Sequence, residues 1–233
     1  MRRYSYIAVS FIILVFGILF IPRIISRFQE SSIIDSNRMS SPLPLAYITL
    51  EGENKRVPDF AFTNQDNRII SNEDYLGKVH VIEFFFTTCP TICPIMNANM
   101  KRLEQAFGNR DDFGIASFTI DPEKDTPEQL KRYAENMDVF SQNWHFLTGD
   151  RSAIYSLANS GFNIFAGMNP NVAGGFEHQG YFALVDQKGY LRSRTDRIGN
   201  PIVYYLGISE DELTTQGTDM LLEDIKKLLE YEY

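Results

Sequence analysis

Residues 79–94 read VHVIEFFFTTCPTICP, a strand-like run that leads into two cysteines. From Val79 to Phe86 the residues are mostly apolar or β-branched, and Glu83 is the acidic exception. A run of this length without polar alternation is typical of a strand that is buried on both faces in the middle of a sheet. The strand is expected to end at Thr87, just before Cys89.

The next segment carries apolar residues at helical spacing, namely Ile92, Met96, Met100, Leu103 and Phe107. Gly108 follows them, and glycine is a common helix terminator. The spacing predicts a helix of about four turns that begins near the first cysteine. The order along the chain is therefore strand, cysteines, helix.

The alternation of strands and helices continues downstream. Residues 115–120 are predicted to form a strand, and Thr126-Pro127-Glu128-Gln129 has the form of a capping box with proline at the first helical position. Strands joined by helices in this way pair in parallel through right-handed crossovers. The sequence further predicts a helix over 150–160, a hairpin of strands 181–185 and 190–193, and an amphipathic helix over 218–229. The fold class is α/β.

Composition sets the class of protein. The chain has 233 residues, of which 44% are hydrophobic, 13% aromatic and 22% charged, which is typical of a globular protein with one domain plus accessory segments. The net charge of -8 argues against nucleic acid as a partner, because binding to a phosphate backbone needs a basic face. Two cysteines are too few for a scaffold held by disulfides.

An apolar segment stands near the start of the chain. Between Tyr6 and Ile21 every residue is apolar or aromatic except Ser10 and Gly17. With interfacial ends the segment reaches about 22 residues, or ~33 Å as a helix. No small-residue cleavage pattern follows, so an uncleaved anchor is favoured over a cleaved signal peptide, and arginines on both sides leave its orientation open. We expect one transmembrane helix in residues 1–25, a linker in 26–50 and one folded domain in 51–233.

Cys89 and Cys93 are the strongest local signal for chemistry. On a helix their spacing would put both side chains on one face, and a helix N-terminus favours a thiolate over a thiol. Two neighbouring thiolates can hold a soft metal ion such as Cu(I), or they can cycle to a disulfide. The alternative is a pair of buried cysteines, or a disulfide, with a purely structural role.

Two thiolates leave a metal site incomplete, and three histidines could extend it. His80 begins the apolar strand and is expected at the end of the sheet opposite the cysteines, in a structural role. His145 lies between Trp144 and Phe146 and is expected to be a packed or surface residue. His178 follows a polar, glycine-bearing stretch before a strand, so it is the candidate ligand if that loop returns to the cysteines.

Four stretches of the sequence support a family resemblance. They are FFFTTCPTICP (84–94), SFTIDPEKDTPEQLKRY (117–133), WHFLTGD (144–150) and HQGYFALVDQKG (178–189). In this order they resemble the SCO (SenC) family of membrane-anchored copper proteins. The upstream VPDFAFTNQDNRIISNEDYLGK (57–78) is similar to thioredoxin-like and peroxiredoxin domains in general.

The resemblance implies a thioredoxin-like fold with a hairpin elaboration, on a domain that faces the periplasm, or the mitochondrial intermembrane space, from the inner membrane. It also implies one copper ion per domain, carried as Cu(I), Cu(II) or both and bound by Cys89, Cys93 and His178. The function that it implies is assembly of the binuclear copper centre of cytochrome c oxidase, with the copper-binding subunit of that oxidase as the partner. Coordination chemistry agrees, because Cu(I) accepts two thiolates and an imidazole, whereas structural zinc normally takes four protein ligands.

The sequence departs from the family pattern at three positions. Many members have a histidine before the first cysteine and an aspartate between the two, where this chain has Thr88 and Thr91. Gln179 stands where a serine is common after the histidine. The two threonines are expected to alter the electrostatics of the thiols, and with it copper affinity and redox potential. Asp121 and Asp125 of the IDPxxDTP element are expected to have structural roles at a strand end and a helix cap.

Two functions of different classes use the same residues. The first is a copper metallochaperone for oxidase assembly. The second is a thiol–disulfide reductase, with Cys89 and Cys93 as redox-active thiols, that acts on the cysteines of a copper site or of another periplasmic protein. His178 separates them, because only the metal site needs the imidazole. A peroxidase-like activity is a third, weaker alternative that turnover of peroxide would reveal.

Overall fold

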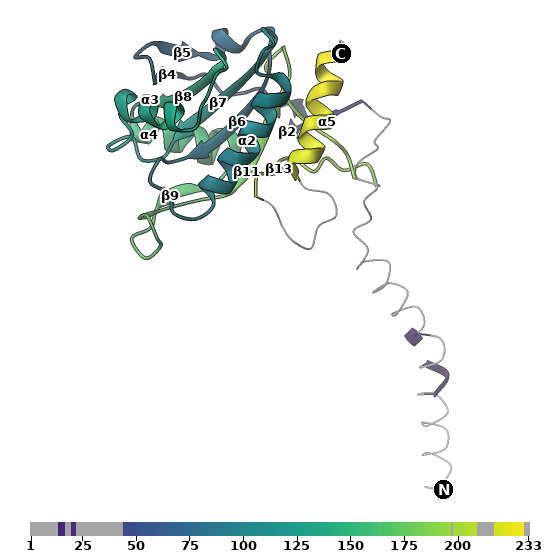
Figure 1. Cartoon of the computed structure of the whole chain (residues 1–233). Helices are drawn as coiled ribbons and strands as arrows, with labels where there is room; N and C mark the ends of the chain where they lie inside the picture. Colours follow the sequence, from purple (N-terminus) through teal and green to yellow (C-terminus); the bar gives the residue numbers. More distant parts are fainter. Residues whose placement is uncertain (1–13, 17–19, 22–43, 197, 209–216, 231–233) are drawn as a thin grey trace, which may run out of the picture. The chain divides into compact units, whose positions relative to one another are not determined.

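The computed structural model describes residues 14–16, 20–21, 44–196, 198–208 and 217–230 (Figure 1). The predicted anchor, except for residues 14–16 and 20–21, and the predicted linker up to residue 43 lie outside the described residues. Within the described ranges, no helix combines the length and the apolar character that a bilayer span requires. The chain divides into two units, Met1–Ser36 and Asn37–Tyr233, and the fold below is that of the second.

A mixed sheet forms the centre of this unit (Figure 1). Its strands are β1 (Ala46–Tyr47), β4 (Ala61–Asn64), β5 (Ile69–Ser71), β6 (Val79–Phe85), β7 (Phe113–Thr119), β8 (Trp144–Thr148), β11 (Tyr181–Val185), β12 (Leu191–Ser193) and β13 (Tyr205–Leu206). Their order is β1-β12-β11-β6-β7-β8-β4-β5, and β13 pairs with β11. The pair β6–β7 is parallel, as the sequence predicts, and β11 and β12 form the predicted antiparallel hairpin. The strand β8, which was not predicted, pairs in parallel with β7.

The helices follow the strands as expected. They are α2 (Cys93–Phe107), α3 (Pro127–Asn136), α4 (Arg151–Ser156) and α5 (Gly217–Glu230), with the one-turn helix η2 (Asn72–Tyr75) and the π-helical segment η3 (Leu157–Phe162). The Thr126 side chain accepts a hydrogen bond from the backbone N–H of Gln129, and Pro127 stands in the first turn of α3. The Thr126 cap and the predicted end of α2 at Gly108 are both confirmed, but the reciprocal half of the predicted capping box is not formed, because the Gln129 side chain contacts Thr87 and Arg132.

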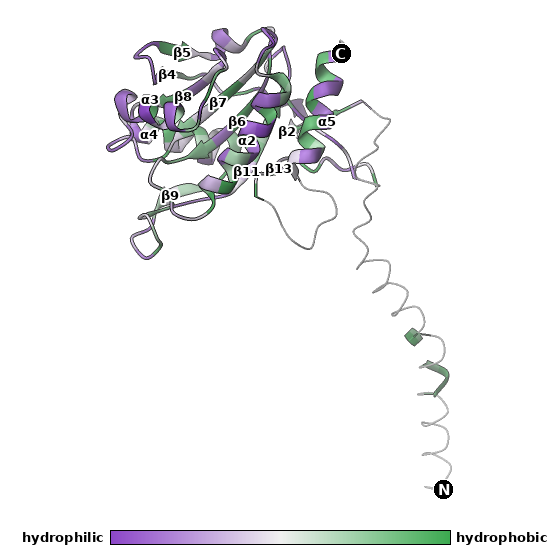
Figure 2. Cartoon of the chain, viewed as in Figure 1, coloured by the Kyte–Doolittle hydropathy of each residue, from purple (hydrophilic) through white to green (hydrophobic). Residues whose placement is uncertain are grey.

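The core lies on both faces of the central strands. Every residue of β6 and of β7 is buried, which confirms the interpretation of residues 79–86 as a central strand. Figure 2 shows hydrophobic residues along these strands and both hydrophobic and hydrophilic residues on α5. The amphipathic α5 buries Met220, Leu221, Ile225 and Leu228 and packs beside α2 and β6.

Short strands appear where the sequence predicts none. Ala46 and Tyr47 of β1 pair with β12, and Leu45 is buried, so the sheet includes residues of the predicted linker and begins before residue 51. Two further strands, β2 (Thr49–Leu50) and β3 (Glu53–Asn54), form a separate hairpin. Another hairpin joins β9 (Ala166–Met168) to β10 (Phe176–His178). Strands of two or three residues are too short to show a hydrophobic period, which is why the sequence pattern misses them.

Candidate metal centre

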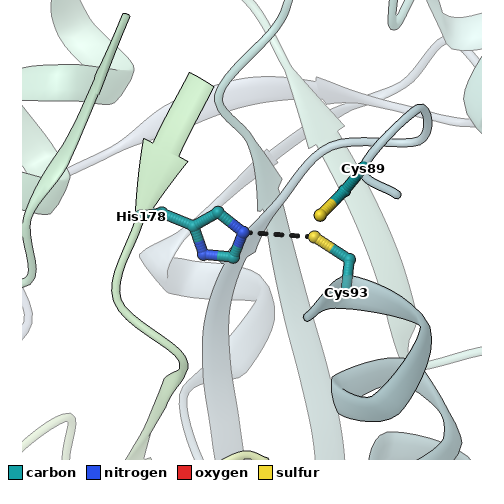
Figure 3. A group of neighbouring side chains, drawn as sticks. All are labelled: Cys89, Cys93 and His178. Atoms are coloured by element: carbon teal, nitrogen blue, oxygen red, sulfur yellow. Dashed lines mark hydrogen bonds between the residues drawn. The ribbon is translucent and has the colours of Figure 1, made fainter. Parts of the chain in front are cut away.

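Three side chains from separate segments meet beyond the end of β6 (Figure 3). Donor atoms of Cys89, Cys93 and His178 all lie within 4.8 Å of one another, and His178 Nε2 is 3.1 Å from Cys93 Sγ. In the part of the chain that the structure describes, this is the one cluster of three or more such residues close enough to hold a metal ion. The sequence predicted these three residues as a site, and the fold brings them together.

Cys89 lies in a turn and not on the helix. The backbone N–H of Cys89 donates to the carbonyl of Phe86 at 3.2 Å, and α2 begins only at Cys93. The prediction that the helix begins near the first cysteine is therefore wrong by about one turn. Pro90 explains the difference, because the residue before a proline is pushed out of the helical conformation. The N–H groups in the first turn of a helix have no acceptor within the helix, so Pro94, which has no N–H group, is tolerated directly after Cys93 at the start of α2.

His178 is the last residue of β10 and does not lie in a loop, which corrects the expectation from sequence. It pairs with Ala166 in the β9–β10 register, and its ring meets Phe86 edge-on at 6.0 Å between centroids. The turn of this hairpin also approaches the cysteines. Gly174 has a φ of +90°, and a Cβ there would come within 3.1 Å of Pro90, so glycine is needed for both the conformation and the close approach.

The imidazole of His178 presents the nitrogen that a metal needs. Its Nδ1 lies 3.3 Å from the backbone carbonyl oxygen of Gln179. A carbonyl only accepts hydrogen bonds, so this contact assigns the ring proton to Nδ1. The lone pair of Nε2 then points at Cys93 Sγ, in the orientation that a backbone carbonyl commonly gives to metal-binding histidines.

The two thiols ionise at very different pH values. The pKa of Cys89 is lowered, first of all by its hydrogen-bonding contact with Cys93, while burial acts in the opposite direction. The pKa of Cys93 is raised by the same contact with Cys89, by burial and by the charge that Cys89 already carries. The pair therefore shares one negative charge and one proton near neutral pH, and both cysteines are free of disulfides.

The other two histidines belong to the core, as predicted. His80 stacks on Tyr75 with 4.6 Å between ring centroids, near the start of β6, while the cysteines follow its far end. His145 Nδ1 lies 3.3 Å from the Asn64 side-chain amide. Burial lowers the pKa of both imidazoles to about 4.

Comparison with known proteins identifies the family. The family model described as SCO1/SenC matches residues 49–209, which is more than half of the chain. The chain belongs to the SCO1/SenC family. The SCO1 protein homolog of Bacillus subtilis (strain 168) is 39% identical over 138 residues, which are 58% of this chain and 71% of that relative. A Stutzerimonas stutzeri protein whose name proposes copper binding is 30% identical over 156 residues, or 64% of this chain and 74% of that protein.

A solved structure supports the same assignment. BsSco, described as a member of the Sco family of cytochrome c oxidase assembly proteins that contains a disulfide switch, superposes with a TM-score of 0.60 at 33% identity. The match covers 75% of this chain and 93% of BsSco. The α/β, thioredoxin-like fold expected from the sequence is therefore confirmed as the SCO fold.

Two aspartates of the IDPxxDTP element are buried near the site. Asp121 follows β7 and forms an ion pair with Lys124 at 3.4 Å. Asp125 precedes the cap residue of α3 and binds the side chains of Thr87 and Thr119. Neither aspartate belongs to the three-residue cluster.

No role was predicted for Glu83 from the sequence, although a single acidic residue within an apolar strand indicates a buried carboxyl group. Glu83 lies fully buried on β6, and its Oε1 accepts a 2.7 Å hydrogen bond from Ser117 Oγ, which in turn accepts one from Trp144 Nε1. Its Oε2 has no hydrogen-bond partner among the described residues. Burial raises the pKa of Glu83 to about 7, and the Ser117 hydrogen bond only partly offsets this.

Thr91, which lies between the two cysteines of this SCO1/SenC chain, contacts the site directly. Its hydroxyl lies 3.6 Å from Cys89 Sγ, whereas Thr88 is exposed. We expect Thr91→Val to raise the pKa of the more acidic thiol by less than about one unit, because a hydrogen bond to the thiolate is lost. Titration of the thiolate absorbance measures this. Thr91→Ser should behave as the wild type, Thr88→Val is the control, and an equal shift in Thr88→Val would contradict a specific role of Thr91.

Proposed function

We propose that this protein is a copper metallochaperone that binds one copper ion through Cys89, Cys93 and His178 and delivers it to the binuclear copper site of cytochrome c oxidase. The observation that carries the proposal is the convergence of two sulfur atoms and one imidazole nitrogen from a turn, a helix start and a strand. The oxidase-assembly function described for the Sco family, including BsSco, supports the choice of partner.

The donor set favours copper as the cargo. Cu(I) is a soft ion that is satisfied by two thiolates and one imidazole, whereas a structural zinc site normally takes four protein ligands. Binding requires Cys93 to lose its proton, so copper loading should release a proton from the shared pair. The ion then replaces that proton between the two sulfur atoms.

A three-ligand site also suits delivery. Cys89 is 9% exposed and Cys93 is 1% exposed, so the ion would be sheltered but approachable from the side of the turn. An incoming cysteine of an acceptor could bind the copper as a fourth ligand before a ligand of this site departs. Such exchange moves the ion without releasing it to water.

The proposal includes the location. The apolar segment in residues 1–25 would tether the domain to the inner membrane, facing the periplasm or the mitochondrial intermembrane space. There the domain could reach the copper-binding subunit of the oxidase.

The second candidate is a thiol–disulfide reductase. The specific observation is that two free thiols share a proton, with the pKa of one lowered and that of the other raised, which suits attack on a disulfide. Oxidation of the pair to a disulfide would supply two electrons and the one shared proton, which convert an acceptor disulfide into one thiol and one thiolate, and the thiolate takes its proton from water. The disulfide switch described for BsSco fits this chemistry as well.

One experiment separates the two functions. The reduced, copper-loaded protein and the reduced, copper-free protein are each mixed with the copper-binding domain of an oxidase subunit, prepared either as a dithiol or as a disulfide. A metallochaperone is expected to transfer copper to the dithiol form. If no copper moves and only the disulfide form is reduced, the reductase function is supported and delivery is refuted.

A further inference from the structure

The IDPxxDTP element has no place in the three-residue cluster, yet it is tied to the segment that carries Cys89. Asp125 is fully buried, and its two carboxylate oxygens both accept hydrogen bonds. The backbone N–H of Thr87 donates to Oδ2 at 3.0 Å, and the Thr87 hydroxyl donates to Oδ1. Hydrogen bonds to an ionised carboxylate are about twice as strong as those between neutral groups.

Two further contacts strengthen this connection. The Thr119 hydroxyl, at the end of β7, donates to the same Oδ2 of Asp125. The Gln129 side chain, on α3, donates to the Thr87 hydroxyl at 3.3 Å. The ends of β6 and β7 and the start of α3 therefore meet at one carboxylate.

Cys89 depends on this connection more than the other two candidate ligands do. Cys93 is held by α2, and His178 by the β9–β10 ladder. Cys89 lies in the Phe86–Cys89 turn, outside any helix or strand, and one backbone hydrogen bond closes that turn. Asp125 accepts hydrogen bonds from this turn at Thr87, two residues before Cys89.

We propose that Asp125 is a positioning residue that holds Cys89 at the distance from Cys93 and His178 that ligand binding and disulfide formation require. The part that concerns copper rests on the proposed function, whereas the part that concerns the disulfide does not. Asp125 contacts neither sulfur, so it acts through Thr87.

The test uses three variants of the full chain. Asp125→Asn weakens both contacts to Thr87, whereas Thr87→Val removes the hydroxyl with its contacts to Asp125 and Gln129 and keeps the backbone contact to Asp125. Thr119→Val is the matched control, because it removes a hydroxyl from the same carboxylate without touching the turn. Three quantities are measured: the Cu(I) affinity by chelator competition, the midpoint potential of the metal-free Cys89–Cys93 pair, and the Tm.

Asp125→Asn and Thr87→Val are expected to weaken Cu(I) binding by about 10-fold or more, as loss of outer hydrogen-bond partners of a metal site typically does. The same variants should shift the midpoint potential to less negative values, because the two thiols are less well placed to form a disulfide. Thr119→Val should lower the Tm without changing affinity or potential. Thr87→Ser, which keeps the hydroxyl, should restore wild-type values.

The outcomes separate this inference from the proposed function. Equal effects of Thr119→Val and Thr87→Val, in proportion to lost stability, would overturn the positioning role, and so would wild-type affinity and potential in both Asp125→Asn and Thr87→Val. If the wild type binds no copper but Asp125→Asn and Thr87→Val still shift the potential, the copper function fails and the positioning role stands.

Discussion

Cys93→Ser is expected to abolish tight Cu(I) binding. The substitution replaces a soft thiolate with a hard hydroxyl at the ligand nearest to His178, 3.1 Å from its Nε2. Affinity should fall by more than the roughly 10–100-fold that loss of an outer hydrogen-bond partner typically costs. Chelator competition on the reduced full chain measures this change. Disulfide formation within the chain is lost as well, because Cys89 is the only other cysteine.

Met96→Leu is the matched control for this substitution. Met96 lies about one turn after Cys93 on α2 and is fully buried. Its soft sulfur atom packs near Gly180, 3.8 Å from the position that a Cβ on that glycine would occupy. Leucine conserves its volume and removes the sulfur. Wild-type affinity in Met96→Leu is expected. Retention of copper by Cys93→Ser, together with its loss from Met96→Leu, would place the ion at a different set of ligands.

Glu83→Gln is expected to change how stability depends on pH. The pKa of Glu83 is raised to about 7 in the folded protein from an ordinary value of 4.5, first of all by burial. Well below pH 4.5 the Glu83 carboxyl is protonated in both the folded and the unfolded protein, so ionisation of Glu83 does not change the free energy of unfolding. As the pH rises toward 7 the unfolded chain loses the proton first, so the folded state loses roughly 3 kcal/mol relative to a neutral side chain.

Chemical denaturation of reduced, copper-free protein at a series of pH values measures this difference. Between about pH 4.5 and 8 the advantage of Glu83→Gln over the wild type should grow by roughly 3 kcal/mol. Groups present in both proteins, such as His80 and His145, cancel in this comparison. Glu128→Gln, an exposed carboxyl on α3, is the control and should follow the wild type. Parallel pH profiles for Glu83→Gln and the wild type would show that Glu83 is ionised normally in the fold.

The parts of the fold that the sequence predicts are those with a long period or a strong end signal. β6 is a continuous apolar run, α2 has apolar residues at helical spacing and ends at Gly108, and α3 begins at a Thr-Pro cap. The β9–β10 hairpin and β1 escaped prediction because each strand has only two or three residues. Their existence depends on pairing with distant segments and not on local pattern.

The three residues of the site were predicted, but their geometry was not. The CxxxC spacing suggested two thiols on one helical face, whereas Pro90 keeps Cys89 outside the helix and the turn brings its sulfur back over the start of α2. The role of the Asp125 carboxylate rests on Thr87, which lies 38 residues earlier in the chain. A hydrogen bond between such distant residues leaves no mark on the spacing of either motif.

The central claim is that the imidazole of His178 completes a copper site with the two cysteines. The most direct test is anaerobic competition of the reduced full chain with a Cu(I) chelator, for the wild type, His178→Ala and the control His145→Ala. One tightly bound copper ion per chain is expected in the wild type and in His145→Ala, with retention in His178→Ala weaker by more than about 10-fold. Copper retained by His178→Ala as tightly as by the wild type would contradict the three-ligand site.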